Sequence, residues 1–293
     1  MKKRRWVGGI FILSLILSVS SCALGAGTTA ANFLKIGVGA RATAMGDAFC
    51  SLTDDGTSLY WNPAGLARIK KNEFLVMYNR WFQDISQGYI SVSYPSKRGV
   101  LGIAINYVDM GTMEGRDIYG QPTGEFGASD SQIMAGYAYK VSPNLLWGVS
   151  GGVLWEVIEN DTQFAYLANL GILLDFTDSY SLGVSIQNIG SKLGEDPLPL
   201  IMKAGLSVNL ERMNLAMDIN KPQDEPLYYS VGIEWWVGNT LALRGGYKTG
   251  QDIPSSSITA GLGFKRSNLG IDYAYVSYAD LGETHRISLK MEF

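Results

Sequence analysis

From residue 73 to the C-terminus, apolar and polar side chains alternate with a period of two. The last segment shows this clearly, because Ile287, Leu289 and Met291 are apolar and the intervening Ser288 and Lys290 are polar. Successive side chains of a β-strand point to opposite faces of the sheet, so such a strand has one apolar and one polar face. No run in this region approaches the roughly 18 apolar residues that indicate a membrane-spanning helix. The pattern predicts an all-β fold.

The alternating segments predict about fourteen strands. Many of them exceed the roughly five or six residues usual in soluble proteins and match the roughly nine to eleven of a tilted membrane strand. Their expected ranges are residues 73–80, 86–94, 99–108, 129–141, 145–158, 162–176, 180–189, 200–210, 213–220, 227–236, 240–248, 256–266, 268–278 and 285–293.

The connections between these segments alternate in length. Those after odd-numbered strands are longer and polar, and the longest spans residues 109–128. Those after even-numbered strands are tight, as at residues 95–98 and 142–144. Transmembrane β-barrels have this asymmetry, with short periplasmic turns and longer outer loops. A large secreted β-sandwich is the alternative, but it offers no reason for connection lengths to alternate.

A closed barrel also suits a lipid environment, because only a closed sheet leaves no unpaired edge. A barrel of this size encloses a lumen wide enough for water or a plug. Aromatic residues would form belts near its two rims, with Trp147 and Trp235 at one end and Trp81 and Tyr228 at the other. Charged residues at inward positions would be solvated or mutually paired: Glu156, Lys203, Asp218, Arg244, Lys265, Asp272, Arg286 and Lys290.

Residues 1–25 have the pattern of a secretory signal peptide. Basic residues at positions 2–5 precede an apolar run near residues 7–19, which is too short for a typical membrane-spanning helix. Cleavage just before Ala26 is one interpretation, and a degenerate lipobox that would make Cys22 a lipidated N-terminus is the other. A short membrane anchor is a further alternative. We expect export, and Cys50 would then have no disulfide partner.

Residues 26–72 do not alternate and predict a separate segment ahead of the barrel at 73–293. Two short helices are expected, one near residues 40–49 and one starting around Asn62, with Pro63 at its first position. A compact segment before a wide barrel is most simply a plug folded into the lumen. The large side chains of the plug have two explanations: they could pack the plug against the wall, or they could bind a ligand. The candidate ligand or plug residues are Phe33, Leu34, Phe49, Leu59, Tyr60, Trp61, Asn62 and Pro63.

Two motifs of this segment, GVGARATAMGDAF and DDGTSLYWNPAGLA, resemble the N-terminal signature of PorV/PorQ proteins, outer-membrane proteins similar to FadL-like long-chain fatty-acid transporters. The resemblance continues through residues 243–250, 272–275 and 281–289. It implies a fourteen-stranded barrel with an N-terminal hatch, and Asn62-Pro63-Ala64 matches the Asn-Pro-Ala of that hatch. Phe293 resembles the aromatic end that the barrel-assembly machinery reads. Cys50 departs from the family, which usually has an aliphatic residue there.

Composition excludes several function classes. Asp and Glu (27) outnumber Lys and Arg (24), so we expect no nucleic-acid partner. One His and two Cys supply few ligands for zinc or haem, and we expect no metal and no cofactor. His285 could act as a catalytic base only beside a serine and an acid such as Asp272 or Asp280. Asp54 and Asp55 are explained by a capped turn more simply than as metal ligands. We expect a protein that is not an enzyme.

Two functions fit this fold. The first is a passive channel in the bacterial outer membrane for hydrophobic small molecules, gated by the hatch. The second is implied by PorV/PorQ relatives in type IX secretion, which receive or anchor cargo, and residues 109–128 could contact such a partner. The expected partners are outer-membrane lipids, the barrel-assembly machinery through Phe293, and either hydrophobic small molecules or secretion-system proteins.

Overall fold

The computed structural model describes residues 27–82, 85–250, 258–278 and 282–293. The predicted signal peptide, residues 1–25, and Cys22 lie outside the described residues. The helices are η1 (Asn32–Lys35), α2 (Ala40–Ala44), α3 (Ser58–Trp61) and η2 (Pro63–Arg68). The strands are β1 (Glu73–Arg80), β2 (Ser86–Ser96), β3 (Gly99–Arg116), β4 (Pro122–Ser142), β5 (Leu145–Ile158), β6 (Asp161–Asp175), β7 (Tyr180–Gly190), β8 (Lys192–Leu193), β9 (Asp196–Pro197), β10 (Ile201–Asn209), β11 (Met213–Pro222), β12 (Tyr228–Val237), β13 (Leu241–Lys248), β14 (Ile258–Arg266), β15 (Leu269–Ser277) and β16 (Glu283–Glu292).

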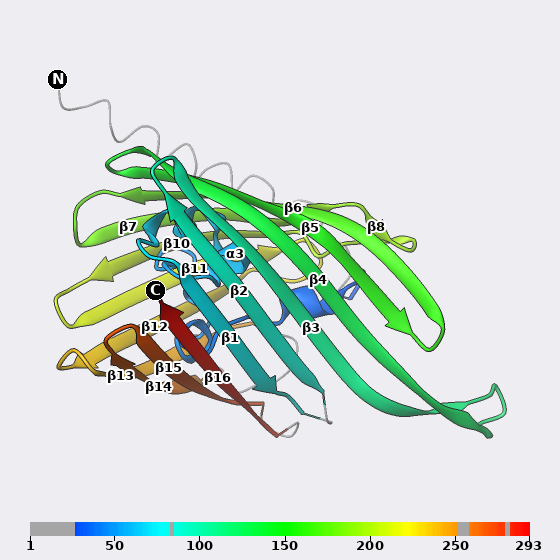
Figure 1. Ribbon diagram of the computed structural model, residues 1–293. Coiled ribbons are helices and arrows are strands. Elements are labelled where there is room, and N and C mark those ends of the chain that lie inside the picture. The colour runs from blue at the N-terminus through cyan, green and yellow to red at the C-terminus, as the bar shows by residue number, and fades with distance from the viewer. Residues whose placement is uncertain (1–26, 83–84, 251–257, 279–281) are drawn as a thin grey trace.

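Fourteen of these strands form one closed antiparallel barrel (Figure 1). Each pairs with its neighbours along the chain, except that β7 pairs directly with β10, and β1 closes the ring against β16. The two remaining strands, β8 and β9, make a small hairpin within the connection from β7 to β10. No helix among the described residues is both long enough and apolar enough to cross a membrane. The predicted all-β fold and strand number are confirmed.

The connection predicted over residues 109–128 is instead largely a hairpin. β3 and β4 continue to pair past an irregularity between Asp109 and Thr112, as far as Arg116 opposite Pro122. They leave the barrel as a two-stranded ribbon, at the lower right of Figure 1. Most side chains of this ribbon are exposed on both of its faces. The prediction failed because strands surrounded by solvent need no apolar face and therefore show no alternation.

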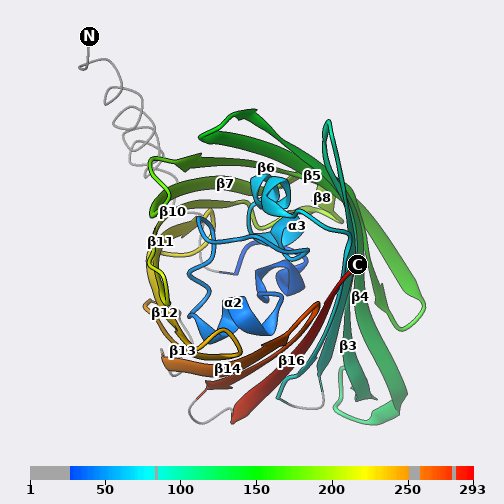
Figure 2. The same cartoon turned by 60° about the vertical axis from the view of Figure 1, so that its left-hand side comes forward.

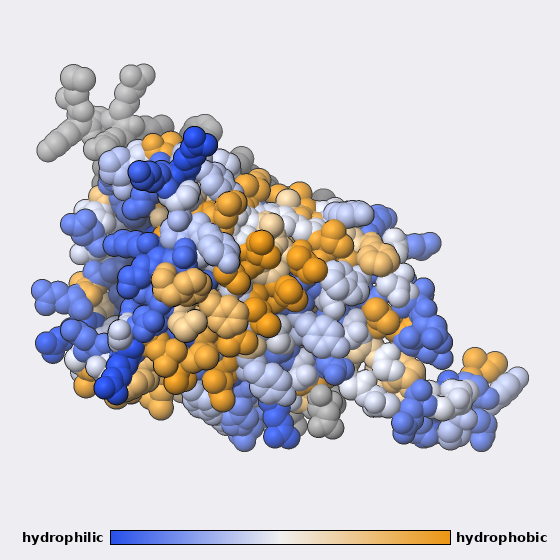
Figure 3. Space-filling model, viewed as in Figure 1, coloured by the Kyte–Doolittle hydropathy of each residue, from blue (hydrophilic) through white to orange (hydrophobic). Residues whose placement is uncertain are grey.

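The two faces of the barrel wall differ as the alternation predicts. Large apolar side chains such as Ile103 and Leu262 are exposed on the outer face, whereas polar ones such as Ser91 and Asn106 are buried inside. Hydrophobic residues gather across the middle of the visible outer face, with hydrophilic residues toward both ends (Figure 3). Tyr228 differs from its predicted place in an aromatic belt, because it occupies an inward position of β12 and is only 6% exposed.

Residues 27–72, called the luminal segment from here on, lie within the ring of strands (Figure 2). The described chain begins at the barrel end with the long connections, where the Ala30 N–H donates to the Pro197 carbonyl. It reaches the tight-turn end at Asn72, whose carbonyl accepts a hydrogen bond from the Phe293 N–H. The luminal segment therefore crosses the lumen from one end to the other before β1 begins.

The helices of the luminal segment are shorter than the sequence predicts. The helix expected over residues 40–49 ends at Ala44, because Gly46 and Asp47 have φ values of 65° and 63°, which a right-handed helix cannot contain. The second helix begins at Pro63 as predicted, and the Asn62 side chain caps it by accepting from the Ala64 N–H at 3.1 Å. It is a 3-10 helix of one to two turns. Helical regularity therefore contributes little to holding this segment in place.

Candidate functional site

The large apolar candidate residues of the luminal segment come together in one cluster. Phe33, Leu34, Phe49, Leu59, Tyr60 and Trp61 are all buried. The Trp61 ring lies 4.8 Å from the Tyr60 ring and 6.4 Å from the Phe49 ring, centroid to centroid, in edge-to-face geometry. The Tyr60 hydroxyl donates to the Leu34 carbonyl, and Trp61 Nε1 donates to the Val38 carbonyl, both at 2.9 Å. These side chains pack on one another, so a ligand could reach them only after they separate.

Asn62 and Pro63 fit against the wall because glycines leave room for them. Asn62 Nδ2 donates to the Cys50 carbonyl at 2.9 Å, which ties the turn to the preceding part of the segment. A Cβ at Gly171 would lie 2.0 Å from Asn62 Oδ1, and a Cβ at Gly148 would lie 2.4 Å from the Pro63 carbonyl carbon. Both distances are far inside van der Waals contact. The wall is therefore shaped around this turn.

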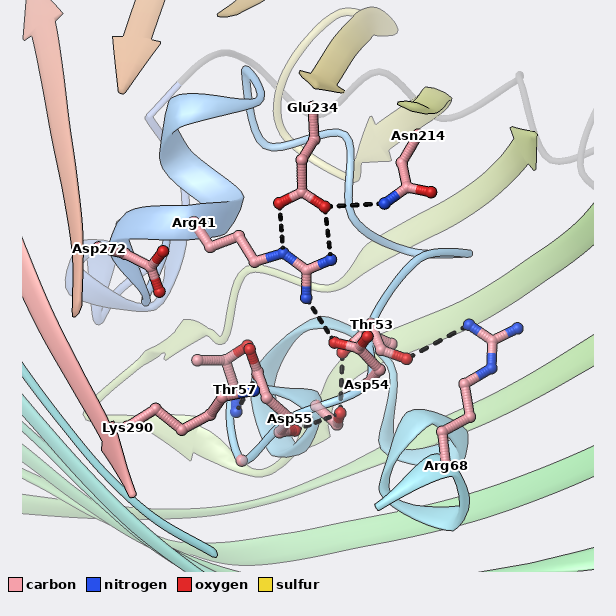
Figure 4. A network of polar contacts seen from close by, with 12 residues as sticks. Arg41, Thr53, Asp54, Asp55, Thr57, Arg68, Asn214, Glu234, Asp272 and Lys290 are labelled. Atoms are coloured by element: carbon pink, nitrogen blue, oxygen red, sulfur yellow. Dashed lines mark hydrogen bonds and ion pairs between the residues drawn. The ribbon is translucent and has the colours of Figure 1, made fainter. Parts of the chain in front are cut away.

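Arg41 on α2 joins the luminal segment to the wall (Figure 4). Its guanidinium forms a bidentate pair with Glu234 on β12, with Nε–Oε2 at 2.8 Å and Nη2–Oε1 at 2.9 Å. Its third nitrogen, Nη1, donates to Asp54 Oδ1 at 2.6 Å within the segment. Bidentate pairs of this kind are directional and strong when water is excluded, and the Glu234 carboxylate is fully buried.

The wall contributes a second arginine to the same carboxylate. Arg244 on β13 donates from Nε to Glu234 Oε2 at 2.7 Å and from Nη1 to Asp272 on β15 at 2.7 Å. Asn214 Nδ2 donates to Glu234 Oε1 at 2.8 Å. We call Arg41, Asp54, Glu234, Arg244 and Asp272 the ionic network. Each buried charge in it has an opposite partner, which offsets the cost of removing it from water.

Asp54 and Asp55 have different environments although they are adjacent. Burial alone would raise the pKa of Asp54, but the positive charges of Arg41, Lys290 and Arg68 together outweigh burial and lower that pKa. Asp55 accepts instead from the Thr57 N–H at 2.9 Å and the Thr57 hydroxyl at 2.5 Å, and burial raises the pKa of this carboxyl. Asp55 therefore makes the capped turn expected before Gly56, whereas Asp54 belongs to the ionic network.

Two of the predicted lumen charges bind backbone groups of the luminal segment. Asp218 Oδ2 accepts from the N–H groups of Phe49 and Cys50, both at 2.8 Å. Arg286 Nη1 donates to the Gly37 carbonyl at 2.6 Å. A segment with little regular structure leaves backbone groups unpaired, and a buried one must find partners elsewhere. These wall side chains supply them.

The other predicted lumen charges take several positions. Lys203 is buried, with Nζ 4.4 Å from the Trp61 ring centroid. Glu156 is partly buried, and Lys290 Nζ lies 3.7 Å from Glu73 Oε2. Lys265 differs from the expected luminal position, since its side chain is 47% exposed. Alternation assigned Lys265 to the correct face of β14. Because β14 ends one residue later, Lys265 lies at the rim of the barrel and not inside the lumen.

A further set of ion pairs fixes the start of the luminal segment near the long connections. Lys35 Nζ lies 2.8 Å from Asp224 Oδ2 and 2.7 Å from Glu225 Oε1, and the Thr29 hydroxyl donates to the same Asp224 oxygen at 2.6 Å. Burial alone would lower the pKa of Lys35, but its two acidic partners raise it. Burial alone would raise the pKa of Asp224, but Lys35 and Thr29 lower it.

Little free space remains beside the aromatic cluster. A cavity of about 30 Å³ lies among Lys203, Tyr60, Trp61 and Tyr228, which is room for about one or two water molecules. Within the described part of the chain, no three His, Cys, Asp or Glu side chains gather as a metal site. His285 Nδ1 lies 2.7 Å from the Tyr273 hydroxyl, in a contact between neighbouring strands. In this conformation the cavity beside the aromatic cluster is therefore too small for a hydrocarbon-sized ligand.

Sequence reasoning missed the central members of the ionic network. Glu234 lies at an inward position of β12 between Ile233 and Trp235, so the alternation that identified the other lumen charges could have found it. Arg41 and Asp54 lie in a segment without alternation, and no pattern there indicates a direction for their side chains. Their partners are set by the tertiary fold.

No family model and no curated protein matches the chain. Several solved structures are similar to the chain. The monoaromatic hydrocarbon channel CymD superposes with a TM-score of 0.71 at 14% identity, covering 88% of this chain and 98% of CymD. The Pseudomonas putida toluene transporter TodX gives 0.68 at 15% identity, covering 87% and 96%. A Pseudomonas aeruginosa FadL homologue gives 0.55 at 11% identity, covering 83% and 95%. These superpositions show that the chain shares the fold of these proteins, and at identities this low they show the fold alone.

Proposed function

We propose that this protein is a FadL-like channel of the bacterial outer membrane for hydrophobic small molecules, and that the luminal segment is its plug. The observation that carries the proposal is the luminal segment itself, which fills the lumen of a closed barrel yet shares no strand ladder with the wall. Between the backbone hydrogen bonds at its two ends, with Pro197 and Phe293, it is attached through side-chain contacts such as Arg41 with Glu234. Such contacts can break and re-form while the barrel stays closed.

The outer face supports a position in lipid. Exposed large apolar residues occur around the barrel, and a closed sheet satisfies its backbone hydrogen bonds without water. The similar folds belong to a monoaromatic hydrocarbon channel, a toluene transporter and a FadL homologue. The aromatic cluster would line the path of an apolar solute once the plug moves. None of this requires catalysis, and we propose that the protein is not an enzyme.

Uptake of radiolabelled toluene tests the proposal. The protein is expressed in cells whose outer membrane lacks a hydrocarbon channel, and toluene is supplied at low concentration. We expect several-fold faster uptake than in cells without the protein, and faster uptake still for Glu234→Ala, in which the plug loses its bidentate anchor. Glu211→Ala, at an exposed turn, is the matched control and should behave as the unaltered protein does.

Arabinose serves as a hydrophilic comparison in the same cells. A plugged channel with an apolar path should leave arabinose uptake unchanged. Equal acceleration of toluene and arabinose would indicate a general water-filled pore, and no acceleration of toluene would remove the transport function.

The second candidate function is that of a PorV/PorQ-type accessory protein of a secretion system. The ribbon of β3 and β4 favours it, because Ile118 and Tyr119 at its tip are 92% and 82% exposed. Asp117 accepts hydrogen bonds from the N–H groups of Tyr119 and Gln121, both at 2.8 Å, which fixes the tip. Exposed apolar side chains on a fixed turn suit a protein partner. Affinity purification from the native host, with Ile118→Ser/Tyr119→Ser as the comparison, would identify such a partner.

The route to the membrane is proposed from the sequence. We propose that residues 1–25 are a signal peptide removed on export, with Cys22 as the lipidated residue only if the lipobox is used. Phe293 would be read by the barrel-assembly machinery. Mass spectrometry of the mature N-terminus decides between cleavage before Ala26 and lipidation of Cys22.

A further inference from the structure

A cavity lies at the tight-turn end of the barrel, away from the ionic network. It measures about 370 Å³ and opens between the end of the luminal segment, the turn from β2 to β3 and the end of β4. We call it the rim pocket. Ile69 and Val100, which are 7% and 5% exposed, contribute apolar surface to it. Its volume would hold a group of several heavy atoms.

The charged side chains around the rim pocket are all basic. Lys70, Lys97, Arg98 and Lys140 line it, all four are exposed, and no acidic residue is among the lining residues. None of the four side chains makes an ion pair or hydrogen bond with a described residue, whereas the nearby Lys71 pairs with Glu292 at 3.4 Å. The whole chain has a net charge of -3, so this concentration of positive charge is local.

Two other turns at the same barrel end have a different charge. The turn from β6 to β7 carries Asp175 and Asp178, and the turn from β10 to β11 carries Glu211 beside Arg212. A general requirement for positive charge at this end would place basic residues on every turn. The turn from β14 to β15 carries two basic residues, Lys265 and Arg266, and Lys265 lies 3.6 Å from Glu292. Around the rim pocket four basic side chains gather with no acidic residue among them, which indicates a binding site for an anion.

The position of the rim pocket favours a lipid as the source of that anion. Tyr139 lines the pocket and also belongs to an aromatic group on the outer face, with ring centroids 6.1 Å from Tyr137 and 5.2 Å from Trp147. Aromatic groups of this kind mark the boundary between acyl chains and headgroups in membrane proteins. Tyr139 therefore connects the rim pocket to the outer face at the level expected for headgroups.

We infer that the rim pocket binds the phosphate headgroup of an anionic phospholipid in the leaflet at the tight-turn end. The inference rests on the proposed membrane position. Lys97 and Arg98 would donate to phosphate oxygens from the turn, Lys70 and Lys140 would add charge from the two flanks, and the acyl chains would lie along the outer face beside Tyr139. Basic pockets beside apolar spans recognise such headgroups elsewhere.

Native mass spectrometry tests this with the full-length protein. The protein is purified in detergent and equilibrated with equal amounts of phosphatidylglycerol and phosphatidylcholine that have the same acyl chains. We expect preferential retention of phosphatidylglycerol, and a loss of about tenfold in that preference for Lys97→Gln/Arg98→Gln. Arg266→Gln, at an exposed turn of the same barrel end, is the matched control and should keep the preference.

The outcomes separate the two proposals. Equal retention of both lipids by the unaltered protein, or an unchanged preference in the double variant, would overturn the rim-pocket inference and leave the membrane position standing. Retention of neither lipid would overturn both. Displacement of phosphatidylglycerol by inorganic phosphate at equal concentration would show that the pocket selects a free anion, which overturns the lipid assignment. Heat-modifiable electrophoretic mobility confirms that each variant is a folded barrel.

Discussion

The barrel wall and the luminal segment are held by different interactions. The wall is a continuous ring of backbone ladders from β1 to β16, and each residue adds hydrogen bonds that depend little on side-chain identity. The luminal segment has only short helices and depends on particular wall side chains, such as Glu234 for Arg41 and Asp218 for the Phe49 N–H. Backbone ladders in the wall and side-chain contacts in the interior allow the two parts to differ in stability, as our proposal that the luminal segment is a plug requires. If the two parts are stabilised separately, a substitution that loosens the luminal segment should leave the wall folded.

The largest effect is expected for Glu234→Ala. The substitution leaves Arg41 and Arg244 buried without their shared carboxylate, which should destabilise docking of the luminal segment by about 3–5 kcal/mol. Hydrogen exchange of residues 27–72 should accelerate, whereas electrophoretic mobility should still show a folded barrel. Glu211→Ala should change neither measurement. Unfolding of the wall in the Glu234 variant would contradict the view that the wall and the luminal segment are stabilised separately.

A smaller effect is expected for Gly171→Val, which fills the space beside Asn62. The added side chain would overlap Asn62 Oδ1, and overpacking of this kind costs about 1–3 kcal/mol. Faster hydrogen exchange should be confined to residues near the Asn62-Pro63 turn. Gly88→Val is the control, because a Cβ at Gly88 would meet no atom within 4 Å. An equal effect of the two substitutions would show that strand propensity, and not contact with the turn, is responsible.

Acid should loosen the start of the luminal segment. The pKa of Asp224 is lowered from 3.8 by Lys35 and Thr29 in spite of burial, so its contribution to stability is present above that pH and is lost as the pH falls below it. The effect should be about 0.5–1 kcal/mol, because Asp224 is buried but its partner Lys35 is partly exposed and solvent weakens the pair from that side. Proteolysis near residues 27–35 should increase below about pH 3.8. Asp224→Asn should show that susceptibility already at neutral pH, whereas Asp178→Asn should not.

The smallest effect on stability is expected at the ribbon tip. Ile118→Ser/Tyr119→Ser removes two exposed side chains, and barrel stability should stay within about 0.5 kcal/mol of the unaltered value in thermal unfolding. Toluene uptake should be unchanged. A fall in uptake would connect the ribbon to the transport path, and loss of a co-purified protein would favour the accessory function.

The difference between the wall and the luminal segment also determines which parts of the structure the sequence predicts. The wall separates an apolar exterior from a polar interior, so alternation reveals its strands, and the predicted limits of 73–80 and 145–158 match β1 and β5. Alternation gives the face of a residue and not its depth, which is why Lys265 is misplaced. Arg41 could not be assigned, because its partner Glu234 lies on a strand far along the chain. Asp54 could not be assigned because it depends on the placement of Arg41. Cys50 is buried, and nothing in the structure explains its departure from an aliphatic residue.

The separation in sequence between the luminal segment and its partners has a consequence for biosynthesis. The Phe49 N–H binds a carboxylate 169 residues later, and the Gly37 carbonyl binds a guanidinium 249 residues later. Residues 27–72 therefore have no complete docking site until nearly the whole chain has been made. They must stay undocked, or be bound by another molecule, through almost the entire period of translation.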